Sequence, residues 1–171
     1  MVLRRAVDML DIPLILEGGT LLGAIRDGDF CEDDWWDVDL TTMVGAECRA
    51  DLCDRAERQG WEVLRTDHKW RPEKHRTAVI KIRRDDVKVD VFFKRVKGRK
   101  AWWSRGKLIR AVDARHYLEP TPTKVYGGEF LVPWMADKYL TARYGDWRTP
   151  VHHNDYDFRT DPCRVAGYHA I

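Results

Sequence analysis

The sequence predicts an α+β fold in which helices pack on one face of a small mixed or antiparallel sheet. Short apolar runs with the residue preferences of β-strands occur in three segments: residues 36–42, 77–82 and 87–93. Apolar stripes with helical spacing occur in three others: residues 1–11, 46–59 and 134–144. Because only the polar turn 83–86 separates the last two strands, we expect them to form an antiparallel hairpin.

The first helix is expected over residues 1–11, where Leu3, Ala6, Val7 and Leu10 share one stripe. Charged side chains interrupt this segment, as they would not in the apolar stretch of a signal peptide. Since no long apolar run occurs elsewhere, the sequence predicts a soluble, cytoplasmic protein without membrane insertion.

A short strand and a short helix follow. Pro13 ends the first helical pattern, and residues 14–17 are predicted to form a buried strand. The glycine pair 18–19 then makes a turn, and Thr20 is a suitable N-cap for a helix that ends at Gly28.

The middle of the chain continues with the helix over residues 46–59, which buries Leu52 and Ala56 and ends at Gly60. A strand over residues 61–65 precedes the predicted hairpin.

Residues 94–112 are basic and aromatic and are predicted to form a hairpin that turns at Gly106. Trp102 and Trp103 have two interpretations. They cover the core from a solvated hairpin, or they join the basic run in holding an anionic acceptor or stacking on a base.

Three prolines in the final third of the chain predict a loop and the start of a helix. Pro120 and Pro122 indicate a loop, whereas Pro133 suits the first turn of a helix over residues 134–144 that stops at Gly145. The residues after that helix show no regular pattern.

The composition restricts the possible functions. Residues 1–171 have the length of a single domain. The 30 basic and 28 acidic residues leave a formal net charge of +2, which excludes a polybasic nucleic-acid binder. The four cysteines follow no CxxC spacing and are expected to be free and reduced. A charge-dependent function must therefore arise from a local cluster.

The positions of three aspartates on predicted strands indicate such a cluster. Asp37 and Asp39 alternate with Val38 and Leu40, so both carboxylates point to one face of a strand, with Cα atoms roughly 6 to 7 Å apart. Asp90 has the same kind of position among the valines of another strand. Because magnesium prefers oxygen ligands, these aspartates predict a site for a hard divalent cation.

The residues upstream suit an anionic ligand. Gly18 and Gly19 let the backbone approach a phosphate closely, and the amides and dipole of the helix that starts at Thr20 attract negative charge. Arg26, on the same helix, is a candidate for the donor phosphates; its alternative role is a surface salt bridge to the acidic loop. The order of glycine pair, helix, DxD strand and third aspartate favours function over chance.

This order resembles the LicD family of the nucleotidyltransferase superfamily with a DNA polymerase β-like core, which includes bacterial phosphocholine transferases, fukutin and fukutin-related protein. The resemblance lies in EGGTLLGAIRDGDF…WDVDL (17–40), VDVFF (89–93) and VPWMADKYLTARYGDWRTP (132–150). CEDDWW (31–36) replaces the usual Pro-Trp and has one extra residue, so Asp33 and Asp34 are expected in a loop rather than as ligands.

The resemblance implies a nucleotidyltransferase-like core and a metal-dependent transferase. Such an enzyme moves a phospho-alcohol, phosphocholine or an alditol phosphate, from a CDP-linked donor to a hydroxyl of a glycan or polyol, and releases CMP. No nucleic-acid partner is expected. The site residues would be Asp37, Asp39 and Asp90 for catalysis and for Mg²⁺ or Mn²⁺, and Gly18, Gly19, Thr20 and Arg26 for the donor phosphates.

Three alternatives remain open at this stage. A nucleotidyltransferase would use the same carboxylates to transfer NMP from an NTP and would release pyrophosphate. A DxD glycosyltransferase normally needs a longer Rossmann-like domain with its DxD later in the chain. A catalytically silent nucleotide-binding module would bind nucleotide with magnesium without turnover.

Overall fold

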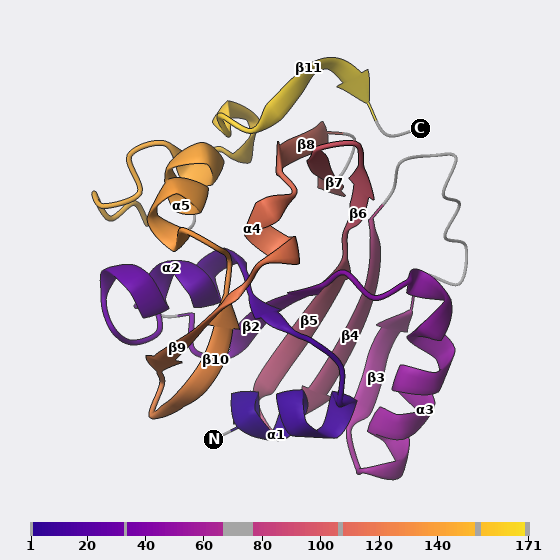
Figure 1. Ribbon diagram of the computed structural model, residues 1–171. Coiled ribbons are helices and arrows are strands. Elements are labelled where there is room, and N and C mark those ends of the chain that lie inside the picture. The colour runs from indigo at the N-terminus through magenta and orange to yellow at the C-terminus, as the bar shows by residue number, and fades with distance from the viewer. Residues whose placement is uncertain (1, 33, 67–76, 106–107, 153–154, 170–171) are drawn as a thin grey trace.

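The computed structural model describes residues 2–32, 34–66, 77–105, 108–152 and 155–169. These residues form two β-sheets with helices around them (Figure 1). The predicted α+β class is confirmed, and the sheet that carries the aspartates is mixed.

The larger sheet has the strand order β3-β4-β5-β2-β1-β10-β9. Its strands are β1 (Ile15–Leu16), β2 (Asp37–Thr42), β3 (Glu62–Thr66), β4 (Ala78–Arg84), β5 (Val87–Phe93), β9 (Thr121–Val125) and β10 (Gly128–Val132). β2 pairs in parallel with β5, and β1 with β10, while the remaining neighbours are antiparallel. The predicted β4–β5 hairpin is therefore confirmed.

The smaller sheet is antiparallel, in the order β11-β8-β7-β6. Its strands are β6 (Arg95–Lys97), β7 (Lys100–Arg105), β8 (Leu108–Asp113) and β11 (Arg164–His169). β7 and β8 form the predicted hairpin, although its predicted turn at Gly106 lies outside the described residues. The sequence did not predict β11, since no regular period marks this segment.

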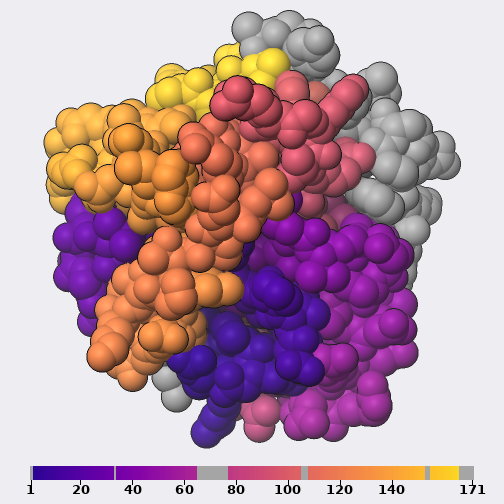
Figure 2. All heavy atoms as spheres, viewed as in Figure 1, coloured from indigo at the N-terminus to yellow at the C-terminus, as the bar shows by residue number. Residues whose placement is uncertain are grey.

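The helices are α1 (Val2–Leu10), α2 (Gly18–Arg26), α3 (Arg49–Arg58), α4 (Arg115–Leu118) and α5 (Ala136–Tyr144). α1 packs against β5 and α3 against β3 and β4, and the two helices form a continuous surface over the larger sheet (Figures 1 and 2). Leu3 and Leu10 of α1 and Leu52 of α3 are buried in the same core as the strand residues Val38 and Val89. Burial of this face leaves the opposite face of β2 and β5 for polar side chains.

Two sequence predictions in the final third are wrong. Pro122 lies within β9 rather than in a loop, because β9 is the edge strand of the sheet, where a missing N–H group is tolerated. The last helix begins only at Ala136, after Met135 in a left-handed conformation (φ 49°), so Pro133 precedes the first turn.

The four cysteines are free, as predicted. In the part of the chain that the structure describes, no helix has both the length and the apolar character needed to cross a lipid bilayer.

Candidate active site

Three carboxylates meet on the polar face of the larger sheet. In the parallel pair of β2 and β5, Asp39 lies directly opposite Asp90, and Asp37 is two residues before Asp39. Each of the three offers a carboxylate oxygen within 4.8 Å of the others. The structure thus brings together the three aspartates that the sequence proposed as a metal site.

The strand pattern explains their orientation. Val38 and Val89 are opposite each other in the register and are 1% and 0% exposed in the core beneath the helices. Because successive side chains of a strand point to opposite faces, burial of these valines turns the aspartates away from the core. A one-residue slip of β5 would bury Asp90 in the core, so the apolar face fixes the register of the site.

The carboxylates repel one another electrostatically. Burial raises the pKa of Asp39, and the negative charges of Asp37 and Asp90 raise it further, to about 8. Burial also raises the pKa of Asp90, against the opposing effect of Lys81 and Lys88. The charged form of the cluster is therefore poorly stabilised by the protein alone.

Two lysines, each opposite one of these aspartates on the adjacent strand, partly compensate the negative charge. Lys81 of β4 donates a hydrogen bond to Asp90. The Lys88 ammonium lies 3.0 Å from the Asp37 carboxylate and 3.9 Å from Asp90 Oδ2. Burial lowers the pKa of Lys88, but the hydrogen bond to Asp37 and the charge of Asp90 outweigh burial and raise it overall.

The donor set fits a divalent cation. Among the described residues, Asp90 Oδ1 is buried and accepts no hydrogen bond, whereas Asp37 Oδ1 lies 3.0 Å from Lys88 Nζ. The carboxyl side chain of Asp90 is only 5% exposed. A buried carboxylate oxygen without a donor is a costly group, which a cation with oxygen ligands would satisfy.

The first turn of α2 lies against this cluster. A Cβ atom added to Gly18, which has φ of +54°, would lie 1.9 Å from Asp39 Oδ2, and one added to Gly19 would lie 2.1 Å from Asp34 Oδ2. Only glycine allows the backbone so close to the carboxylates. The amides of the first helical turn have no partner within the helix and are therefore available to a ligand beside the aspartates.

Thr20 has a different local role from the predicted one. The helix starts at Gly18 with Glu17 as its N-cap, so the prediction of Thr20 as N-cap is wrong. Thr20 is buried in the first turn, and its Oγ1 accepts a hydrogen bond of 2.9 Å from the Asp39 amide. This bond joins α2 to the acidic strand.

Arg26 is at the other end of α2. Its guanidinium donates to both carboxylate oxygens of Asp27, over 2.8 and 2.7 Å. The same guanidinium lies 3.7 Å from Cys31 Sγ, which lies 3.5 Å from the Gly19 carbonyl oxygen, so Cys31 links Arg26 to the first turn of α2. Asp34 lies in the predicted loop, whereas Asp33 lies outside the described residues.

A buried polar cluster that the sequence did not predict lies beside the site. Lys94, directly after β5, donates to Glu17 Oε2 over 2.6 Å, and the hydroxyl of Tyr117 lies 3.0 Å from the same oxygen. Tyr139 donates to Glu17 Oε1. Lys94 is the buried exception in the basic run, since Lys97, Arg99 and Lys100 are exposed. Trp103 is only 7% exposed in the core, in agreement with a solvated hairpin that covers the core.

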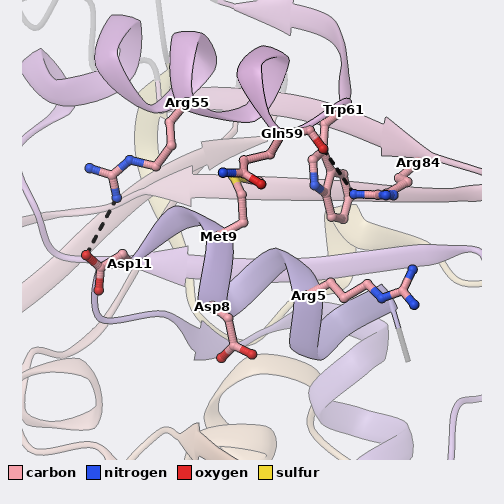
Figure 3. Close-up of a pocket in the computed structure, with 8 residues that line it drawn as sticks. All are labelled: Arg5, Asp8, Met9, Asp11, Arg55, Gln59, Trp61 and Arg84. Carbon is pink, nitrogen blue, oxygen red and sulfur yellow. Dashed lines mark hydrogen bonds and ion pairs between the residues drawn. The ribbon is translucent and has the colours of Figure 1, made fainter.

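A separate hollow lies on the helix-covered side, between α1, α3 and the end of β4 (Figure 3). It is lined by Arg5, Asp8, Met9, Asp11, Arg55, Gln59, Trp61 and Arg84. Arg55 donates to the Leu10 carbonyl over 2.6 Å, and Arg84 to the Gln59 carbonyl over 3.1 Å. None of the predicted site residues lines this hollow.

The fold and the three-carboxylate site define an α+β protein with a candidate metal-binding active site. The LicD/FKTN/FKRP nucleotidyltransferase domain matches residues 11–133. This range includes the glycine pair and all three aspartates. The chain belongs to this family, and its activity is accordingly that of a transferase for nucleotide or phospho groups.

Comparison with solved structures identified two structures of ANT(2″)-Ia. The crystal structure in complex with adenylyl-2″-tobramycin has a TM-score of 0.47 and 17% identity, covering 91% of this chain and 78% of that chain. The solution structure, described as showing substrate-regulated conformation dynamics, has a TM-score of 0.44 and 16% identity, covering 85% and 74%. No curated protein matches the sequence significantly.

Proposed function

We propose that this protein transfers a phospho-alcohol, phosphocholine or an alditol phosphate, from a CDP-linked donor to a hydroxyl of a glycan or polyol, with release of CMP. The observation that carries the proposal is the convergence of Asp37, Asp39 and Asp90 beside the first turn of α2, in a chain of the LicD family.

In this proposal Asp37, Asp39 and Asp90 hold Mg²⁺ or Mn²⁺. An ion held there would supply positive charge for the donor diphosphate and for the charge that develops on the leaving CMP. The amides of Gly18, Gly19 and Thr20 face the same phosphates and orient the donor. Arg26 remains a prediction as a phosphate-binding residue, and this role requires its pair with Asp27 to open.

The transfer is a single displacement at the phosphorus atom of the transferred group. The acceptor hydroxyl oxygen forms a bond to the phosphorus of the transferred group, the bond from this phosphorus to the bridging oxygen breaks, and CMP leaves with that oxygen. The hydroxyl proton passes to Asp90, at the carboxylate oxygen that would not ligate the ion.

Product analysis tests the proposal. The protein is incubated with Mg²⁺, with CDP-choline, CDP-ribitol, CDP-glycerol, CTP or ATP, and with mixed polyol and glycan acceptors. We expect CMP from a CDP-linked donor, and a loss of at least about 100-fold in D39N, because one metal ligand loses its charge. The matched control is D54N, the same change at an exposed position of α3, which should retain wild-type turnover.

The leaving product distinguishes the alternatives. Pyrophosphate from CTP or ATP would instead identify a nucleotidyltransferase. If the folded wild-type protein with Mg²⁺ binds no cytidine nucleotide, the CDP-donor proposal is refuted; binding without any product from this panel would favour the catalytically silent module.

A further inference from the structure

We propose that Lys81 and Lys88 form a binding site for the phosphates of a nucleoside diphosphate-linked donor, on the side of the carboxylates away from α2's glycine pair. The proposal rests on the proposed function and adds to it a part of the site that neither the motif nor the family match assigns. The lysines belong to β4 and β5 and extend the polar face of the sheet beyond the three aspartates.

The strand register places both lysines in the site. Lys81 is directly opposite Asp90 in the β4–β5 pair, and Lys88 is directly opposite Asp37 in the β2–β5 pair. Neighbours across a ladder have side chains on the same face. Both lysine side chains are about one quarter exposed, at 27% and 25%, so a ligand from solvent can reach their ammonium groups.

The charge balance indicates that the lysines change partner when the site is filled. With all three carboxylates ionised, as ligation of a metal requires, three carboxylates and two ammonium groups give the cluster one net negative charge. A divalent cation bound to the same carboxylates turns this into one net positive charge and repels the ammonium groups at short range. A lysine released from its carboxylate has a flexible stem and a compact positive charge suited to a phosphate oxygen.

Two further cations in the described part of the chain, Lys94 and Arg26, already have other partners. Lys94 is buried against Glu17, and Arg26 is paired with Asp27. In the segments that the structure describes, the ion pairs made by the three aspartates involve Lys81 and Lys88. These two residues are therefore the cations best placed for a diphosphate that is coordinated beside the carboxylates.

A purely structural role predicts the opposite result. If the lysines only neutralise the carboxylates, their removal leaves more negative charge, which raises metal affinity and leaves nucleotide affinity at saturating metal unchanged or higher. If they bind phosphate, their removal lowers nucleotide affinity even when the metal site is saturated. The sign of the change in nucleotide affinity therefore separates the two roles.

The experiment measures binding by the full chain. Mn²⁺ affinity is obtained by electron paramagnetic resonance, and CDP and CMP affinities by calorimetry at saturating Mn²⁺. We expect K88Q and K81Q each to weaken CDP binding by roughly tenfold, the value of one charged hydrogen bond, and to weaken CMP binding less. K88R should retain most of the affinity for CDP. K124Q, the same change at an exposed position of β9, should bind both nucleotides as the wild type does.

The outcomes are distinct. Wild-type CDP affinity in K88Q, together with raised Mn²⁺ affinity, would overturn the inference and leave the proposed function intact. Failure of the wild-type protein itself to bind CDP with Mn²⁺ would overturn both. Because K81Q removes the partner of the buried Asp90 and could unfold the protein, K88Q and K88R, with folding checked by circular dichroism, decide the question on their own.

Discussion

Two clusters of the same chemical groups lie side by side in this protein and differ in how well they are satisfied. In the buried cluster around Glu17, a lysine and two tyrosines meet one carboxylate, and both carboxylate oxygens have donors. In the acidic cluster, three carboxylates meet two lysines, and Asp90 Oδ1 accepts no hydrogen bond among the described residues. The first arrangement holds the structure together, whereas the second has unused capacity to bind a cation.

The electrostatics of the two clusters differ accordingly. Burial raises the pKa of Glu17, but the positive charges of Lys94 and Arg143 outweigh this effect and bring it below its ordinary value. For Asp39, burial and the neighbouring carboxylates act in the same direction and raise the pKa to about 8. The comparison shows that the balance of partners, rather than burial alone, separates a structural carboxylate from a candidate ligand.

The largest expected effect on stability comes from breaking the buried pair. K94M leaves the Glu17 carboxylate buried without its cation, and we expect it to lower the free energy of unfolding by about 3 kcal/mol or more. D39N, measured in EDTA, removes one of three repelling charges and should leave stability unchanged or raise it. Urea unfolding measures both; a similar loss in the two variants would contradict the distinction between the clusters.

Metal binding should act on one cluster only. At about 100 times its dissociation constant, Mg²⁺ should stabilise the wild-type protein by about 2.7 kcal/mol, which corresponds to a rise in Tm of about 5 °C or more. D37N should lose this rise, while E17Q should start from a lower Tm and retain it. Differential scanning calorimetry in EDTA and in Mg²⁺ measures the rise in Tm. An equal rise in D37N would show that the metal binds to other residues.

A pair of glycines tests the contact between α2 and the carboxylates. Gly18 and Gly28 both have left-handed backbones, with φ of +54° and +73°, but only Gly18 would place a Cβ against another residue. Both G18A and G28A should lose about 1 kcal/mol of stability from the backbone conformation. G18A should in addition weaken Mn²⁺ and nucleotide binding, because its methyl group would displace the Asp39 carboxylate; normal binding in G18A would argue against the close approach.

The last prediction concerns an effect that appears only at alkaline pH. Burial lowers the pKa of Lys94 from 10.5 to about 8 in the folded protein. Between these pH values the unfolded chain retains a proton that the folded protein has released, so this lysine makes stability rise with pH across the window. The measurement is the stability difference between wild type and K94M at pH 7.5, 9 and 10.5. A difference that stays constant over this range would contradict the shifted pKa.

The three aspartates of the acidic cluster could be predicted from the sequence, because the residues next to each aspartate indicate which face of the strand it occupies. The alternation of Asp37, Val38, Asp39 and Leu40 defines which face each side chain takes, and the valines around Asp90 do the same for β5. The identity of the neighbouring strands is not local, so the positions of Lys81 and Lys88 opposite the aspartates required the structure.

The parts that were missed depend on distant contacts. Glu17 and Lys94 are 77 residues apart in the chain, and each alone is an ordinary charged residue in the sequence. Pro122 was predicted in a loop because proline is excluded from most strand positions. Its place in an edge strand depends on the order of the whole sheet, which the local sequence does not show. The strand β11 has no period of its own and follows from its pairing with β8.

The parallel pairing of β2 with β5 determines when the three aspartates come together during folding. Lys88 and Asp37, which face each other in this pair, are 51 residues apart, so their pairing closes a long loop that contains α3, β3 and β4. During synthesis, Asp37 and Asp39 emerge well before Asp90, so the nascent chain presents an incomplete set of ligands. A cation that requires all three aspartates would therefore bind only after this long-range pairing, and it would slow unfolding rather than speed folding.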